Sequence, residues 1–310
     1  MGHTGTLDSF AQGLLVVCTG RLTRLAGNIT EFDKSYKAVI KFGEETDTLE
    51  YTGNVIRTAA LPLLDDLKKS LTKYTGNIMQ QPPAFSAIHI DGHRASDLAR
   101  KGKTADIPSR PVTVFKADLL DTMLNSENRV LYALIDFSVS KGTYIRSLAR
   151  DIAEDCSSAA HLAGLYRTKV GNFKIEDAAG FSKLEEFTIK NTINTISKQL
   201  SIIKAKTTAE KKPYIPDENE LALQEEIRKK IQTFTHDTSI LCGFNNINLI
   251  SDAAEKDFKN GKPIVSRNFD TKLYSLNDNS ISAVFSPDGS FAGLIEKNSE
   301  GKIHYKFVIN

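Results

Sequence analysis

Cysteine is scarce in this chain, and its few copies are widely separated. The 310 residues contain three cysteines, Cys18, Cys156 and Cys242, with no C-x-x-C pair and no cluster of cysteine and histidine at metal-ligand spacing. Disulfide frameworks and structural zinc sites need such clusters. The sequence therefore predicts neither a disulfide framework nor a metal site, and the cysteines are expected to be small buried apolar side chains or incidental thiols.

Long hydrophobic runs are also missing. No stretch approaches the roughly 18 consecutive apolar residues that span a bilayer. The N-terminus lacks the basic segment followed by an apolar one that marks a secretory signal. Apolar residues make up 40% of the chain and charged residues 25%, which suffices for a packed interior and for solubility. We therefore expect a globular cytoplasmic protein without a membrane partner.

Neither sign of charge is in large excess, because 40 Lys and Arg face 38 Asp and Glu, for a net charge of +2. RNA-binding proteins usually concentrate their basic residues, so the distribution is more informative than the sum. Residues 94–116 show a local excess of basic side chains over Asp97 and Asp106. The basic residues of this stretch are Arg94, Arg100, Lys101, Lys103, Arg110 and Lys116. The stretch either follows a phosphate backbone or forms a solvated loop and helix face, and composition alone favours the second interpretation.

The first 180 residues show mixed strand and helix patterns. Residues 14–18 are a continuous apolar run close to a glycine on each side, which predicts a strand buried on both faces. Residues 36–42 and 131–139 alternate apolar with other side chains, which predicts two strands, with Tyr36 on the apolar face of the first. Residues 141–146 then lead through a glycine turn into a helical pattern.

The rest of the chain divides into a connector and a β-rich region. Residues 186–245 are polar and rich in Lys and Glu, with helical propensity but only a thin apolar stripe. Beyond them, Ser251 fits a helix N-cap, and apolar side chains recur with period two to the C-terminus. A chain of 310 residues accommodates one or two domains. We predict a larger domain over 1–185, a polar helical connector over 186–245 and a small domain over 246–310.

The candidate chemistry lies at the N-terminus, in the segment GHTGTLD. This segment joins two glycines, two hydroxyl groups, an imidazole and the carboxylate of Asp8 within residues 2–8. Glycines let the backbone approach a ligand, and a carboxylate on such a loop suits nucleophilic or general-base catalysis. Taken alone, the segment is more often a turn capped by its aspartate side chain.

The longer run GHTGTLDSFAQGLLVVCTGRLT closely resembles the signature of TruB pseudouridine synthases. In that signature, GHxGTLDP is followed by a small residue, a glycine and an apolar strand. The resemblance implies that Asp8 is the active-site aspartate. It also implies that His3 contacts the stem-loop of the RNA substrate.

Further elements match the family in the same order along the chain. KSYKA resembles K-x-Y-x-A, whose tyrosine packs against the target base, which implies that role for Tyr36. KGTYIR matches the element whose tyrosine and arginine line the pocket, which implies that role for Tyr144 and Arg146. Either tyrosine taken alone is more often a core residue. The ordered set of motifs favours the functional role.

Two more elements extend the resemblance. Residues 81–100 resemble PPxxSAxKxxGxRAYxxAR, and the segment from Leu165 to Phe173 matches L-x-R-x-x-x-G-x-F. The leucine of the latter element borders the uracil in the family, which implies that role for Leu165. The resemblance is strong over residues 1–180 and looser over 246–310, which look like the small PUA-type RNA-binding domain of such enzymes.

Three departures from the family are visible. Family members carry a further segment with a KPxGxTS element before the GHxGTLD motif, whereas this sequence begins on the motif, and we expect a misassigned start or a fragment. The usual proline after the aspartate is Ser9. The usual lysine and tyrosine of the PPxxSA element are His89 and Ser96. The last changes bear on substrate contacts and not on the aspartate.

The resemblance implies an α/β (α+β) pseudouridine synthase fold, with a mixed, largely antiparallel central sheet flanked by helices and a small β-rich PUA-like C-terminal domain. The implied reaction isomerises a flipped-out uridine at position 55 in the T-loop of tRNA. An aspartate serves as the nucleophile, and neither a metal nor a cofactor is needed. Arg146, a permanent cation, is the expected partner that keeps Asp8 ionised.

The expected partner is the T-stem-loop of tRNA and not DNA, and the expected state is a monomer. One alternative is a catalytically impaired tRNA-binding protein or tRNA-folding chaperone on the same scaffold. A guide-RNA-dependent relative is disfavoured because the chain shows no obvious protein-docking extension.

Overall fold

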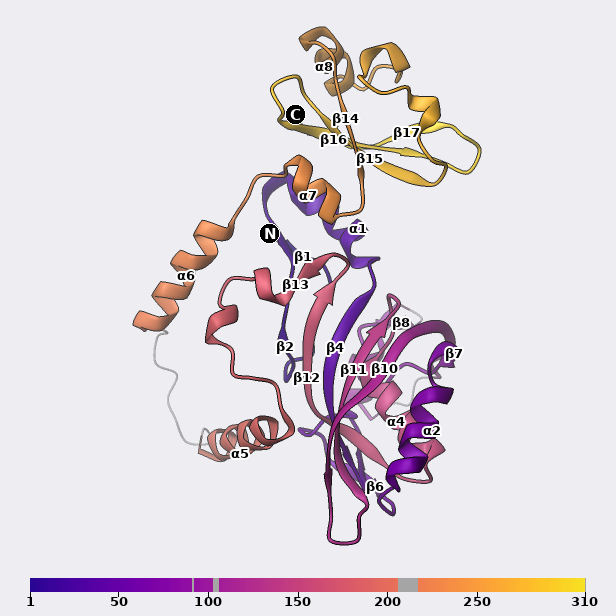
Figure 1. Cartoon of the computed structure of the whole chain (residues 1–310), viewed down its shortest axis with the longest axis vertical. Helices are drawn as coiled ribbons and strands as arrows, with labels where there is room; N and C mark the ends of the chain where they lie inside the picture. The colour runs from indigo at the N-terminus through magenta and orange to yellow at the C-terminus, as the bar shows by residue number, and fades with distance from the viewer. Residues whose placement is uncertain (91, 103–105, 206–216, 310) are drawn as a thin grey trace.

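The computed structural model of the chain describes residues 1–90, 92–102, 106–205 and 217–309. The chain forms a large sheet with helices on both faces, and further helices lead from it to a smaller sheet at the C-terminal end (Figure 1). No helix within the described ranges is both long and apolar enough to cross a membrane.

The central sheet has seven strands. Six follow the order β13-β12-β4-β11-β10-β7, and the seventh, β2, pairs with β12. Neighbouring strands along this order are antiparallel, whereas β2 runs parallel to β12. The strands are β2 (Gln12–Gly13), β4 (Lys34–Phe42), β7 (Gly76–Gln80), β10 (Arg110–Leu124), β11 (Val130–Val139), β12 (Ala160–Val170) and β13 (Phe173–Lys174). The two strands predicted from alternation, β4 and β11, are confirmed and lie side by side.

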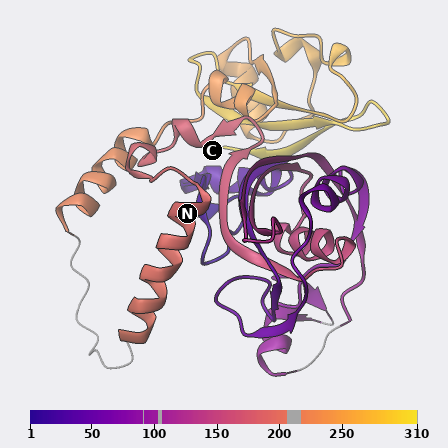
Figure 2. The same ribbon diagram turned by 60° about the horizontal axis from the view of Figure 1, so that its bottom comes forward.

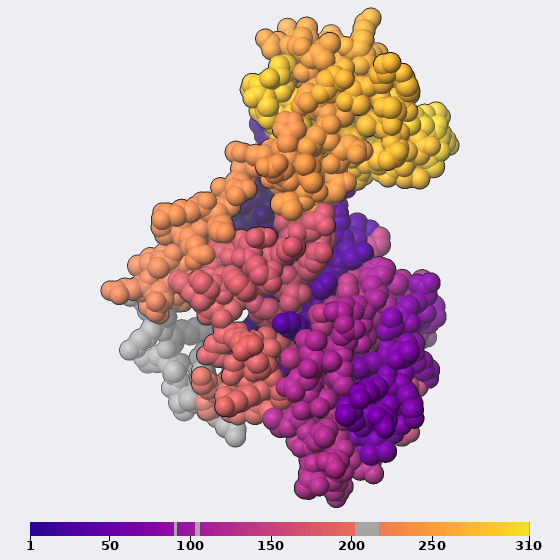
Figure 3. All heavy atoms as spheres, in the orientation of Figure 1, coloured from indigo at the N-terminus to yellow at the C-terminus, as the bar shows by residue number. Residues whose placement is uncertain are grey.

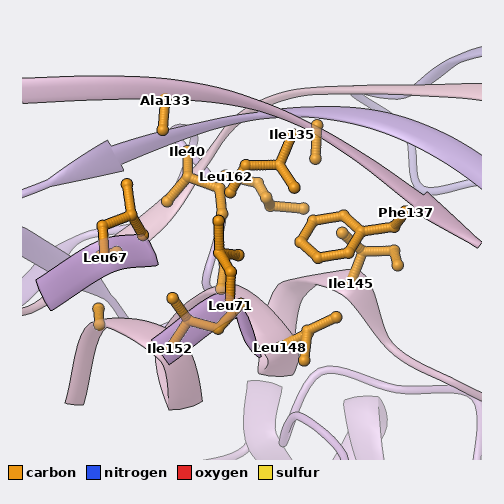
Figure 4. Close-up of a cluster of buried hydrophobic side chains, with 14 of the residues drawn as sticks. Ile40, Leu67, Leu71, Ala133, Ile135, Phe137, Ile145, Leu148, Ile152 and Leu162 are labelled. Carbon is orange, nitrogen blue, oxygen red and sulfur yellow. The ribbon is translucent and has the colours of Figure 1, made fainter. Parts of the chain in front are cut away.

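Two helices, α2 (Leu64–Lys73) and α4 (Ile145–Asp155), cover one face of this sheet (Figure 2). Alternate residues of β4 and β11 point toward these helices because side chains two apart in a strand share a face. The main core lies between the two layers, and Figure 4 shows ten of its labelled side chains meeting there. These are Ile40, Leu67, Leu71, Ala133, Ile135, Phe137, Ile145, Leu148, Ile152 and Leu162. This core fixes the position of α4 against the sheet.

The opposite face of the sheet is covered by α5 (Ile189–Ala205). Its Ile189 packs with Val39, Leu134 and Ala163, which point away from the main core. Both faces of the central strands are therefore buried, and α5 belongs to the body of the molecule although it lies in the predicted connector.

The predicted single strand over residues 14–18 is wrong. Only Val17–Cys18 of the run forms a strand, β3, which pairs with β1 (Gly2–His3). Strand β2, which pairs with β12, ends at Gly13, before the run. Leu15 and Val17 are each 44% exposed, whereas Leu14 and Cys18 are buried. The apolar run indicated a buried strand, but strand pairing is limited to its last two residues, and Leu15 and Val17 face outward.

Short elements connect the larger ones. They are η1 (Gly20–Leu25), α1 (Ala26–Thr30), β5 (Glu44–Thr46), β6 (Val55–Thr58), β8 (His89–Ile90), β9 (His93–Arg94), α3 (Ala95–Arg100), η2 (Ile175–Asp177) and η3 (Phe181–Lys183). After α5 come α6 (Glu218–Lys230) and α7 (His236–Leu241), which agree with the helical propensity of the polar segment.

The C-terminal region is β-rich, as predicted. Its sheet has the order β14-β15-β16-β17, with β14 (Asn245–Asn248), β15 (Ser280–Phe285), β16 (Phe291–Lys297) and β17 (Ile303–Val308). Ser251 caps α8 (Asp252–Lys259) as predicted, since its hydroxyl accepts from the N–H of Ala254 at 3.2 Å. In the space-filling view this region forms a lobe at one end of the molecule (Figure 3). The exact domain limits stay a prediction.

This lobe shares a core with the N-terminal segment. Cys18, Leu25 and Ile29 belong to the same apolar cluster as Phe285 and Leu294 of the C-terminal sheet. Burial raises the pKa of Cys242, which is in this cluster, to about 12. The thiol of Cys242 is thus a small apolar group at neutral pH, in agreement with the sequence interpretation.

Gly13, at the end of β2, should not tolerate a side chain. Its φ is +107°, and a Cβ there would lie 2.3 Å from the carbonyl oxygen of Arg167 on β12. We expect Gly13→Ala to lower the free energy of unfolding by at least about 2 kcal/mol, measured by denaturant titration. The matched control is Gly27→Ala, where nothing lies within 4 Å of the added carbon. Equal midpoints for the two variants would contradict the described β2–β12 contact.

Candidate active site

Asp8 lies in a tight loop between β1 and β2. The loop begins at Thr4, which is fully buried and donates to the carbonyl of Val16 from its N–H at 3.1 Å and from its hydroxyl at 3.2 Å. Gly5 adopts φ +129°, which side chains disfavour. The N–H of Ala11 then donates to the carbonyl of Asp8 at 2.9 Å. These hydrogen bonds fix the backbone of the loop, whereas the side chain of Asp8 is 31% exposed.

The carboxylate of Asp8 pairs with Arg146 through two parallel hydrogen bonds. Nη2 of the guanidinium donates to Oδ1 at 2.9 Å, and Nε donates to Oδ2 at 3.1 Å. The guanidinium also donates to the carbonyl of Thr48 from Nη1 and to that of Phe85 from Nη2, each at 3.0 Å. The side chain of Arg146 is 6% exposed. Such a two-bond pair fixes orientation as well as charge, and the carbonyls hold the guanidinium in place.

The position of Arg146 follows from the start of α4, which is built around Tyr144. The buried amide of Gln80 bonds to the backbone of Tyr144 on both sides: Tyr144 N–H donates to Oε1 at 2.8 Å, and Nε2 donates to the Tyr144 carbonyl at 3.1 Å. The guanidinium of Arg110 lies 5.2 Å from the centre of the Tyr144 ring and donates to the carbonyl of Gly142. Gln80 on β7 and Arg110 on β10 therefore fix the turn before α4, and this turn determines the position of Arg146.

Tyr36 and Leu165 come from neighbouring strands. In the β4–β12 ladder, Leu165 lies opposite Ala38, and Arg167 lies opposite Tyr36. Burial raises the pKa of the Tyr36 hydroxyl, and Arg167 opposes this rise through its charge and a side-chain hydrogen bond. The negative charge of Asp8 adds to the rise. The Tyr36 hydroxyl is thus within electrostatic reach of both Asp8 and Arg167.

The six side chains predicted for the site do not all meet. Asp8 and Arg146 are in direct contact, and the charge of Asp8 acts on the Tyr36 hydroxyl. Tyr144 directly precedes α4, which begins at Ile145 and carries Arg146 in its first turn. Leu165 is 5% exposed and belongs to the main core. His3 is exposed on β1, and no contact of its side chain with this group is found among the described residues.

The basic stretch over residues 94–116 is partly paired within the protein. Arg100 bonds to Asp97, and Lys116 bonds to Asp118 and Asp136. Arg94 and Lys101 are exposed. Lys103 lies outside the described residues. The role of the stretch along a phosphate backbone stays a prediction.

Several residues of the site were not identified from the sequence. Burial raises the pKa of the Glu50 carboxyl, the hydrogen bond from Thr52 and the charge of Arg146 oppose this, and the charge of Asp8 reinforces it. Glu50 therefore lies in the field of the ion pair. Gln80 and Arg110 act on main-chain atoms far along the chain, which no sequence pattern reveals. Arg167 is the arginine of the L-x-R-x-x-x-G-x-F element, and the sequence predicted no role for it.

A cavity of 290 Å³ adjoins the site on the side of α5. Leu165 lines it together with Phe10, two residues after Asp8, and with Tyr51, whose ring packs edge-on against that of Phe10. Asp8 itself is not among the described residues that line it. Within the described ranges, no group of three or more His, Cys, Asp or Glu side chains is placed to hold a metal ion.

Comparisons with known proteins agree with these motifs. Residues 1–145 match the family model described as TruB family pseudouridylate synthase (N terminal domain). A curated protein of Treponema denticola named tRNA pseudouridine synthase B is 48% identical over 201 residues, which cover 60% of this chain and 56% of that protein. The protein of the same name from Bordetella parapertussis is 42% identical over 188 residues, which cover 59% of this chain and 75% of that protein. This chain thus spans little more than half the length of the Treponema relative.

Among solved structures, a chain in the crystal structure of a Cbf5-Nop10-Gar1 complex matches with a TM-score of 0.60 and 19% identity. The match covers 99% of this chain and 75% of that chain. At this identity the likeness concerns the fold, and the predicted fold class is confirmed. The Bordetella relative is 42% identical and is covered to 75% of its length, and the loop with Asp8 lies in the segment that matches the family model. This chain therefore belongs to the TruB family of pseudouridylate synthases.

Proposed function

We propose that this chain isomerises uridine to pseudouridine at position 55 in the T-loop of tRNA, with Asp8 as the nucleophile. The observation that carries the proposal is the two-bond ion pair between Asp8 and Arg146. The guanidinium is 6% exposed and the carboxylate 31% exposed. This asymmetry fits a reactive carboxylate that a substrate can reach and a buried cation that orients it.

The reaction breaks one bond and forms another. The bond between C1′ and N1 of uridine is cleaved, the uracil turns, and C1′ is joined to C5. The proton on C5 is released and N1 gains a proton, so atoms and electrons balance without any imported group. Asp8 assists by covalent attack on the base or on C1′, or by promoting a glycal intermediate, and each route uses the ionised carboxylate.

The target nucleotide must leave its stack to reach Asp8. Flipping a base out costs about a few kcal/mol, whereas stacking on an aromatic ring is worth about 1 to 3 kcal/mol. Tyr36, whose hydroxyl is within the electrostatic influence of Asp8, supplies such a ring. Tyr144 contributes a second ring, which Arg110 holds from one side. Leu165 closes the apolar side of the pocket, and His3 contacts the stem-loop from its exposed place on β1.

The choice of tRNA as substrate rests on the relatives. The two curated relatives, at 42% and 48% identity, are both named tRNA pseudouridine synthase B. The solved neighbour has 19% identity and says nothing about the substrate of this chain. The β-rich C-terminal lobe fits a PUA-like RNA-binding domain that holds the tRNA while Asp8 acts on the T-loop.

An unmodified tRNA transcript tests the proposal. After incubation with the protein, we expect pseudouridine at position 55 and at no other position, mapped by chemical probing of the RNA. A transcript with cytidine at that position is the matched control and should yield no product. If the transcript binds but stays unmodified, the chain is a tRNA-binding protein or folding chaperone and the proposal fails.

A further inference from the structure

Among the residues that the structure describes, Arg167 is the largest side chain that is almost completely buried, with 1% exposure. It lies on β12, two residues after Leu165, in the L-x-R element that matched the family. Burial of a guanidinium is unfavourable unless its donors are satisfied. The contacts of this group therefore indicate what it does.

The guanidinium joins the two arms of the loop that carries Asp8. Nε donates to the carbonyl of Leu14 at 2.7 Å, and Nη2 donates to the carbonyl of Gly5 at 3.2 Å. Gly5 precedes Asp8 by three residues, and Leu14 follows it by six. The backbone of Arg167 adds a third bond, because Leu14 N–H donates to the Arg167 carbonyl at 2.8 Å. One residue thus closes the loop at both ends.

The same side chain reaches the tyrosine proposed to stack on the target base. Arg167 lies opposite Tyr36 in the β4–β12 ladder. Its charge and a side-chain hydrogen bond lower the pKa of the Tyr36 hydroxyl against the effect of burial. Arg167 therefore connects the loop of Asp8 to the strand that carries Tyr36.

The guanidinium stabilises the loop and also fixes its geometry. Among the described residues its hydrogen bonds to the loop go to main-chain carbonyls and not to a carboxylate. An apolar side chain of similar length would leave these two carbonyls without their donor. A lysine would supply the charge, but it lacks the planar set of donors that holds the two carbonyls at a fixed spacing.

We propose that Arg167 is a positioning residue for the isomerisation. It sets the distance between Asp8 and the ring of Tyr36 by tying both arms of the catalytic loop, residues 5–14, to β12. The inference rests on the function proposed above.

Two substitutions test it. Arg167→Lys keeps the charge but loses the fork, and Arg167→Met keeps only the length. We expect the single-turnover rate of pseudouridine formation to fall about 10- to 100-fold in Arg167→Lys and further in Arg167→Met, with tRNA affinity within about twofold of wild type. The control is Arg129→Lys, whose guanidinium donates to the carbonyl of Leu61 at 2.9 Å. Its rate should match wild type.

A double-mutant cycle separates positioning from general support of the fold. If Arg167 acts through Tyr36, the double variant Arg167→Met/Tyr36→Phe should lose less rate than expected from independent sites. Its fold-loss should be smaller than the product of the fold-losses of the two single variants. Multiplicative effects, or a parallel loss of rate, tRNA affinity and thermal stability, would reduce Arg167 to a structural residue and overturn the inference.

Hydrogen exchange tests whether Arg167 fixes the loop of Asp8, and this measurement does not depend on catalytic turnover. The amides of Thr4, Ala11 and Leu14 are hydrogen-bonded in and around the loop. We expect them to exchange at least about 10-fold faster in Arg167→Lys than in wild type or Arg129→Lys. If wild type forms no pseudouridine, the proposed function fails, and unchanged exchange would separately overturn the role of Arg167.

Discussion

Replacement of Asp8 by asparagine should abolish pseudouridine formation and leave tRNA binding within about twofold of wild type. Asparagine has the same shape, but its neutral amide cannot act as a nucleophile. We expect a loss of at least about 10⁴-fold in the single-turnover rate, the scale seen when a reacting group is removed from an enzyme. The measurement is release of the C5 proton from tRNA labelled at that position.

The structure offers a matched control for this substitution. Asp118→Asn removes a surface carboxylate that pairs with Lys116, which keeps its second partner, Asp136. Its rate should equal that of wild type. Residual product above about 1% of the wild-type rate in Asp8→Asn would remove Asp8 from the role of nucleophile. Loss of tRNA binding would instead make Asp8 a binding residue.

Replacement of Arg146 by lysine should give the second largest effect. Lysine retains the positive charge but cannot make two parallel bonds to Asp8 while also donating to the carbonyls of Thr48 and Phe85. We expect the rate to fall about 10²- to 10³-fold, the range for loss of one well-placed electrostatic contact. Affinity for tRNA should change little, because the guanidinium is buried and faces Asp8.

A second arginine of the same helix is the control for Arg146. Arg150 pairs with Asp151 and donates to the carbonyl of Gln81 at 3.1 Å. Arg150→Lys should leave the rate within about threefold of wild type, as expected for a partly exposed ion pair. If Arg146→Lys were equally mild, a charge alone would suffice near Asp8, and the two-bond geometry would have no part in the reaction.

Local patterns in the sequence predicted much of the fold. Alternation located β4 and β11, and the helical pattern after residue 146 located α4, because both reflect which side chains face the core. For residues 14–18, the apolar pattern gave a wrong prediction. Their apolar character predicted burial, but it carried no information on strand pairing, which involves only Val17 and Cys18 and leaves Leu15 and Val17 exposed.

The sequence predicted the two charged residues of the candidate site, but not the residues that hold them in position. The family motifs indicated Asp8 and Arg146, which lie 138 positions apart and meet in the structure. Gln80 and Arg167 were missed as supports because they bond mainly to backbone atoms. Any residue type offers the same carbonyl and N–H, so the partner of such a side chain leaves no trace in the sequence.

The apolar cluster that joins Cys18, Leu25 and Ile29 to the C-terminal sheet affects more than stability. These residues directly follow the loop of Asp8, and Arg24 donates to the carbonyl of Val308 at 2.9 Å. The C-terminal lobe therefore contacts the N-terminal segment through packed side chains, in addition to being connected to it by the chain. If the C-terminal lobe binds tRNA as proposed, this packed junction fixes the distance from the bound RNA to Asp8, and only a nucleotide at that distance reaches the carboxylate.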